Sequence, residues 1–162
     1  MYDRILLPTD GSLGMASAIE QCFHQARESG ATIHALFVVD LRAYVMLPEE
    51  TRDRVRDLLA EEGRRALEFL EDRAAEEAVD LVAELQEGVP HEAILRYAEE
   101  TEVDLIVMGT HGQTGEERHI VGSVAAAVVR FAEVPVMTVR MREEDAAALE
   151  SEVPEEQRRY IS

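Results

Sequence analysis

The chain has 162 residues and a formal net charge of −18, from 16 basic and 34 acidic side chains. This charge opposes binding to nucleic acid or to an anionic membrane surface, because the phosphate groups of either would be repelled. Hydrophobic residues make up 46% of the chain, and the length is typical of one domain, so we expect one packed core.

The basic residues are all arginine, and the single cysteine is Cys22. An acidic excess without lysine favours a protein adapted to a salty cytosol, where charge repulsion is screened; a GC-rich genome is the alternative explanation. One cysteine excludes an internal disulfide and a cysteine metal cluster, and the apolar neighbours of Cys22 are typical of a core. The chain shows no signal peptide and no apolar run as long as a membrane span, which predicts a cytoplasmic protein.

The first elements alternate between strand and helix. An apolar run over residues 4–8, ended by a proline, predicts a buried strand. Ser12 is expected to cap a helix over 13–29, and Gly30 is well placed to end it. The almost continuously apolar segment 32–40 predicts the second strand.

A long amphipathic helix is predicted over 48–78, with leucine, valine and alanine on one face and Glu and Arg on the other. Gly63 leaves open whether this helix is continuous. A third strand is expected over 79–88 and a third helix over 90–101, with Pro90 in its first turn. We interpret the charged helix face as a solvated surface.

The last regular elements are a strand over 103–109, a helix over 123–133 and a strand over 134–141. The sequence beyond them is acidic and interrupted by a proline, so we expect one domain over 1–142 and a short helix or frayed tail over 143–162. Strands that are apolar on both faces and separated by helices predict an α/β fold, a doubly wound parallel sheet covered on both sides.

A glycine-rich loop, GTHGQTGEERHIVGSV, follows the fourth predicted strand. Gly109, Gly112 and Gly115 would let main-chain N–H groups approach an anion, and Ser123 would begin a helix whose N-terminus favours phosphate. Such a site is expected beyond the carboxyl ends of the strands, where strand order reverses. The loop is neither a Walker A loop nor a G-x-G-x-x-G dinucleotide loop. A surface connection without a ligand is the alternative.

The loop also matches the G-x2-G-x9-G-[S/T] signature, with glycines at 109, 112 and 122 and Ser123 after them. In this, and in ILLPTDGS near the start and VPVMTV near the end, the chain over residues 1–140 resembles the nucleotide-binding universal stress proteins. The resemblance implies a Rossmann-like five-stranded sheet of order 3-2-1-4-5, similar to the adenine nucleotide alpha hydrolases. It also implies that the chain binds ATP.

The same resemblance implies a role for each of ten residues. Asp10 would face the ribose, and Val38 would meet adenine through its main chain and side chain. The remaining residues would line the pocket wall (Pro8, Thr9), lie near ribose and adenine (Met108, Gly109) or hold the phosphates (Gly112, Gly122, Ser123, Val124). Mg²⁺ would bridge the phosphate oxygens, which commonly hold it with few protein ligands.

Several of these residues have simpler explanations. Asp10 could be only a turn residue or helix cap, and Val38 and Met108 could be packing residues. His111 in the loop is expected to be exposed. The carboxylates of Glu116 and Glu117 are unfavourable near a triphosphate unless they face solvent or a metal.

The sequence leaves the biochemical activity open. No lysine is available to reach the phosphates, and the five histidines lack the spacing of metal ligands. We therefore expect a nucleotide-binding regulator acting on an unknown partner. The alternative functions are a slow ATPase or other nucleotide-processing enzyme, and an interaction module whose pocket is empty.

The strand that ends the predicted sheet, Val134 to Val139, is apolar with few charges. Exposed strand edges of this kind favour pairing with another strand, and a two-fold homodimer would pair the edge strands of both copies. The resemblance implies the same arrangement. The alternative is that the acidic tail of the same chain covers this edge.

Overall fold

The computed structural model describes residues 1–110, 121–141 and 151. In this part of the chain a five-stranded parallel sheet has the order β3-β2-β1-β4-β5, which confirms the predicted fold. The strands are β1 (Arg4–Thr9), β2 (Thr32–Val39), β3 (Leu81–Glu87), β4 (Leu105–Gly109) and β5 (Val136–Val139). Each strand begins and ends within two residues of its predicted range.

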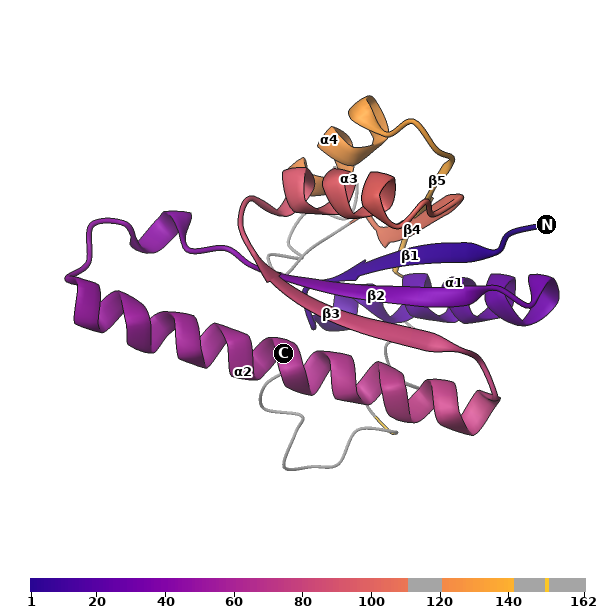
Figure 1. Cartoon of the computed structure of the whole chain (residues 1–162), viewed down its shortest axis with the longest axis horizontal. Coiled ribbons are helices and arrows are strands. Elements are labelled where there is room, and N and C mark those ends of the chain that lie inside the picture. Colours follow the sequence, from indigo (N-terminus) through magenta and orange to yellow (C-terminus); the bar gives the residue numbers. More distant parts are fainter. Residues whose placement is uncertain (111–120, 142–150, 152–162) are drawn as a thin grey trace.

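Helices cover both faces of the sheet (Figure 1). On one face lie α1 (Ala16–Ser29) and α2 (Glu49–Glu77), and on the other lie α3 (Pro90–Glu100) and α4 (Ser123–Phe131). Two short 3-10 helices, η1 (Leu13–Met15) and η2 (Arg42–Tyr44), follow β1 and β2. The sheet is therefore the middle of three layers.

Strand β1 illustrates why the strands are apolar throughout. Ile5 and Leu7 are fully buried in the cluster that includes α1 and α2 side chains, whereas Leu6 is fully buried in the cluster that includes α3 and α4 side chains. Successive side chains of a strand point to opposite faces, so a strand with helices on both sides needs apolar residues at consecutive positions. The sheet thus builds two cores, one on each face.

The first helical segment differs from its prediction. Residues 13–15 form the 3-10 helix η1, and α1 begins at Ala16. The side chain of Ser12 makes no cap hydrogen bond, so the predicted cap is wrong. Gly30 ends α1 in the left-handed conformation, with a φ of 72° and its N–H donated to the carbonyl of Ala26, as its position predicted.

Helix α2 runs through Gly63 without a break. It buries one face, including Leu67, Leu70 and Ala74, against β2 and β3. Its 29 residues extend about 43 Å at 1.5 Å per residue, well beyond the seven-residue strand β3 that it covers. No helix within the described ranges is both long and apolar enough to cross a membrane.

Candidate functional site

A cleft of about 550 Å³ opens at the carboxyl ends of β1, β2 and β4. Strand β1 lies between β2 and β4 in the sheet, so this is the point at which strand order reverses and where open α/β sheets bind ligands. Nine of the ten residues that the sequence indicated line the cleft, namely Pro8, Thr9, Asp10, Val38, Met108, Gly109, Gly122, Ser123 and Val124. The tenth, Gly112, lies outside the described residues.

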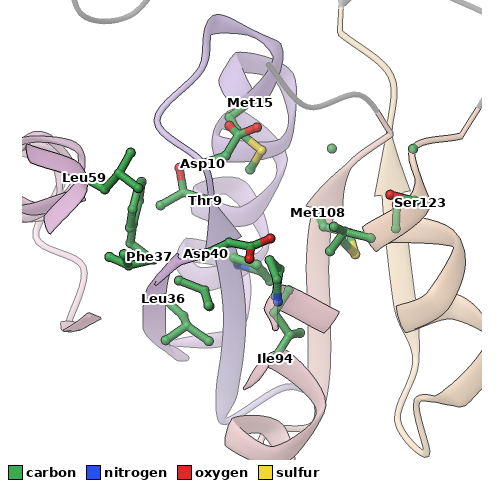
Figure 2. A pocket seen from close by; sticks show the side chains of 18 of the residues that line it. Thr9, Asp10, Met15, Leu36, Phe37, Asp40, Leu59, Ile94, Met108 and Ser123 are labelled. Atoms are coloured by element: carbon green, nitrogen blue, oxygen red, sulfur yellow. The ribbon is translucent and has the colours of Figure 1, made fainter. Parts of the chain in front are cut away.

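The N-terminus of α4 forms one side of the cleft (Figure 2). The first hydrogen bond of the helix runs from the N–H of Ala126 to the carbonyl of Gly122 at 2.9 Å. The N–H groups of Ser123, Val124 and Ala125 precede this bond, so helix geometry gives them no acceptor within the helix. Together with the Ser123 hydroxyl they make a donor set that suits an anion.

Gly122 contributes to the site in a different way. Its N–H donates to the carbonyl of Thr110 at 2.7 Å, and the Thr110 N–H donates to Val139 of β5 at 3.1 Å. The Gly122 amide is therefore already used to fasten α4 to the end of β4. A Cβ atom at position 122 would lie 3.3 Å from the Thr110 carbonyl oxygen, so the glycine permits a close approach of two main-chain segments.

Asp10 lies in a tight turn directly after β1. Its Oδ1 accepts two hydrogen bonds from Ser12, one from the main-chain N–H at 2.9 Å and one from the hydroxyl at 2.6 Å. This is why the Ser12 side chain does not cap a helix. Gly11 between them has a φ of 75°, a left-handed conformation that favours glycine, and its N–H donates to Thr9 Oγ1 at 3.1 Å.

The wall of the cleft formed by β2, β4 and the helices α3 and α4 is apolar. Met108 is 5% exposed and belongs to the core cluster on the α3 and α4 face, together with Leu36 and Ile94. Val38 and Val124 are partly buried against the same cluster. Met108 and Val38 are therefore packing residues that also line the cleft. Their side chains give a flat apolar part of a ligand an apolar surface to pack on, beside the strand ends.

Asp40 is a lining residue that the sequence reasoning missed. It follows β2 as Asp10 follows β1, and an acidic residue directly after an apolar strand was the signal that could have found it. Its Oδ1 accepts hydrogen bonds from the Arg42 N–H and Nε, and its Oδ2 accepts one from Arg42 Nη2 at 2.7 Å. The hydrogen bonds from the Arg42 guanidinium lower the pKa of the Asp40 carboxyl, so Asp40 stays ionised.

Other missed lining residues come from the loops and helices that face the strand ends: Met15, Ala43, Tyr44, Leu59, Glu62, Pro90, Ile94 and Thr110. The sequence around each of these residues gives no local signal for a ligand site, because the residues come together only in the folded structure. Figure 2 shows Leu59 and Phe37 on one side of β1, with Met108 and Ser123 on the other.

The charged side chains among the described lining residues are Asp10, Asp40 and Glu62, all acidic. An anionic ligand must therefore be held by main-chain amides, hydroxyls or an accompanying cation. In the described ranges no group of three or more His, Cys, Asp or Glu side chains could hold a metal ion. His111, Glu116 and Glu117 lie outside the described residues.

Comparison with known proteins gives the family. The model of the universal stress protein family matches residues 1–140. A universal stress protein of Methanocaldococcus jannaschii is 41% identical over 141 residues, which cover 86% of this chain and 83% of that protein. The solved structure of a universal stress protein from Lactobacillus plantarum is 31% identical, with a TM-score of 0.75, and the match covers 86% of this chain and 98% of that one.

A universal stress family protein of Arabidopsis thaliana, solved with AMP bound, has a TM-score of 0.67 over 88% of this chain and 94% of that one. At 21% identity this likeness shows the fold alone. The family match spans every strand and helix described above and all ten residues of the predicted site. From its sequence and its fold, the chain belongs to the universal stress protein family.

Proposed function

We propose that this protein binds ATP in the cleft, with Mg²⁺ on the phosphates, and acts as a nucleotide-dependent regulator in the stress response. The observation that carries the proposal is the convergence of nine predicted residues and the N-terminus of α4 on one cleft at the reversal of strand order. The AMP held by the Arabidopsis protein of the same fold is consistent with an adenine nucleotide here.

The cleft offers a suitable surface for each part of the nucleotide. Adenine would lie on the apolar wall at Val38 and Met108, and a ribose hydroxyl would donate to the carboxylate of Asp10. The phosphates would accept hydrogen bonds from the first amides of α4 and from the hydroxyl of Ser123. Pro8 and Thr9 would shape the wall between these parts.

The residues present also fit a magnesium ion that arrives with the nucleotide. Mg²⁺ prefers oxygen ligands, keeps several waters and is commonly held by phosphates with one or two protein groups. The cleft supplies the hydroxyl of Ser123 rather than a protein cage, while the carboxylate of Asp10 would stay with the ribose. When bound, the ion would offset the repulsion between the phosphates and the acidic lining residues.

Mass spectrometry of nucleotide released from the purified protein, followed by titration calorimetry with Mg²⁺ and ATP, tests the proposal. We expect ATP in the released fraction and saturable uptake that Ser123→Ala weakens about tenfold, because a hydroxyl that hydrogen-bonds a charged oxygen is lost. Ser29→Ala, at the far end of α1, is the control and should bind as the unaltered protein does. Absence of uptake by the unaltered protein would refute the proposal.

A phosphate-release assay on the same samples separates a regulator from a slow ATPase. We expect bound ATP to persist over many hours, since the described lining residues include no basic side chain to stabilise the charge of a departing phosphate. Release of phosphate that Ser123→Ala abolishes would instead indicate turnover in the cleft.

We also propose that two copies pair through the edge of the sheet. Strand β5, at the end of the sheet order, has three partly buried apolar side chains at Val136, Met137 and Val139. Val129 and Phe131 of the adjacent helix α4 are 52% and 58% exposed. We further propose that the domain spans residues 1–142 and that residues 143–162 form an acidic tail outside it.

A further inference from the structure

We propose that Ser12 is a positioning residue that fixes the carboxylate of Asp10, and that this pair makes the cleft prefer ribonucleotides over deoxyribonucleotides. The inference rests on the proposed function, because it needs a nucleotide in the cleft. It adds a selectivity for the sugar and assigns it to a residue that does not itself line the cleft.

The geometry points to Ser12 because both of its donors meet the same oxygen. The main-chain N–H and the hydroxyl reach Asp10 Oδ1 at 2.9 and 2.6 Å. Hydrogen bonds to an ionised acceptor are short and about twice as strong as those between neutral groups. Two donors that converge on one oxygen fix both the direction of the Asp10 side chain and the rotation of its carboxylate plane.

The main chain of the turn is held independently of the Ser12 hydroxyl. The Gly11 N–H donates to Thr9 Oγ1, and the Ser12 carbonyl accepts the Met15 N–H at 3.1 Å, which begins η1. A Cβ at Gly11 would lie 3.3 Å from the Cβ of Ala66, so the turn rests against α2. Removing the hydroxyl should therefore leave Asp10 Oδ1 with the residue-12 main-chain N–H as its donor from this residue, which holds the carboxylate less firmly and leaves the turn in place.

A fixed carboxylate can discriminate between sugars. It accepts a hydrogen bond from a ribose hydroxyl in one defined place, and a deoxyribose there cannot supply that hydrogen bond. A carboxylate that is held less firmly can turn toward solvent when the ribose hydroxyl is missing, so the deoxy analogue is penalised less. Ordering the side chain in advance also removes part of the entropy cost of binding.

The test measures the affinities of ATP, 2′-deoxy-ATP and 3′-deoxy-ATP by calorimetry with Mg²⁺ present. The unaltered protein should prefer ATP to one of the deoxy analogues by about tenfold or more, the value expected for a hydrogen bond to a charged group. Ser12→Ala should reduce that ratio to about threefold or less, and Ser12→Thr should retain it because threonine keeps the hydroxyl. Ser29→Ala is the matched control, since its hydroxyl also donates at 2.6 Å, to the Gln25 carbonyl, at the end of α1.

A double-mutant cycle distinguishes positioning from a general loss of structure. In the Asp10→Ala background, Ser12→Ala should leave the ratio unchanged, because the group that it positions is gone. An equal fall in affinity for all three nucleotides in Ser12→Ala, with the ratio intact, would overturn the inference. Equal binding of ATP and both deoxy analogues by the unaltered protein would overturn it while leaving the proposed function standing, and no binding of ATP would remove both.

Discussion

At the scale of single residues, His34, which lies outside the cleft, shows how the fold controls the protonation state of a side chain. His34 Nδ1 lies 2.9 Å from the Tyr97 hydroxyl of α3, and the two rings meet edge to face. Burial lowers the pKa of His34, and the positive charge of Arg4 lowers it further. The imidazole is therefore held neutral in the folded protein at neutral pH.

Replacing Arg4 by glutamine should raise the pKa of His34, because one nearby positive charge is removed. The titration of the imidazole resonances by NMR measures this. Since the folded pKa lies below the ordinary value of 6.5, the contribution of His34 to stability is full above pH 6.5 and is lost as the pH falls toward the folded pKa. Arg4→Gln should reduce that loss, whereas Arg27→Gln, which removes a different exposed pair, should not.

The residue scale also shows what sequence reasoning can and cannot place. The resemblance to the family indicates Asp10 and Val38, the strand-end position of Asp10 supports the first, and both line the cleft. Hydrogen-bond partners are set by the fold, and the sequence alone predicts a helix cap for the Ser12 hydroxyl and a phosphate contact for Gly122. The structure directs the first to Asp10 and the second to Thr110.

At the scale of elements, hydrophobic periodicity predicted the order and nearly the length of each strand and helix, because burial on one or both faces leaves a pattern in the sequence. The continuity of α2 at Gly63 could not be predicted in the same way. A glycine lowers helix propensity wherever it stands, and the reason for this one lies in another element. Phe37 of β2 and Leu85 of β3 occupy the space that a side chain would need.

Gly63→Ala should therefore destabilise the protein although alanine favours helices. The added Cβ would lie 2.5 Å from Cδ1 of Phe37, a core residue, and 2.9 Å from Cδ1 of Leu85, which packs against the same core. Overpacking costs about 1–3 kcal/mol, which exceeds the gain of about 1 kcal/mol in helix propensity. Urea unfolding measures the difference, with Glu61→Ala on the exposed face of α2 as the control. A rise in stability for Gly63→Ala would show that α2 can move away from the sheet.

At the scale of the whole molecule, the proposed dimer depends on the outer edge of β5, the last strand in the sheet order. The carbonyls of Pro135 and Val139 accept hydrogen bonds from β4 and from Thr110, so by the alternation of the strand Val136 and Thr138 direct their main-chain groups away from the sheet. Thr138 is also exposed. Its N–H, directed away from β4, is the group that a second copy would meet.

Thr138→Pro should convert a dimer to a monomer in gel filtration with light scattering. Proline removes the outward N–H and keeps the bonds to β4, and edge strands tolerate it when the N–H faces outward. Thr138→Val, which keeps the N–H, should remain dimeric. A dimer that persists in Thr138→Pro would place the interface elsewhere on the molecule.

The net charge of −18 leads to the last prediction, that salt stabilises this protein. Salt has two opposing effects here, since it weakens ion pairs such as Arg73–Glu20 and also screens repulsion among unpaired carboxylates. With 34 acidic and 16 basic residues, pairing can neutralise fewer than half of the acidic groups, so the relief of repulsion should dominate. The melting temperature should then rise with KCl, mainly below about 1 M, where the Debye length has shortened to about 3 Å.

Sucrose and a charge-reduced variant separate screening from other effects of salt. Sucrose strengthens burial without screening charge, so it should raise the melting temperature equally in all variants. Glu68→Gln combined with Glu71→Gln and Glu76→Gln removes three exposed charges from α2. This variant should be more stable than the unaltered protein in low salt and should gain less from KCl, because less repulsion remains to be screened. A melting temperature that is flat or falls with KCl in the unaltered protein would mean that ion pairing outweighs repulsion, and the acidic composition would then have no role in salt tolerance.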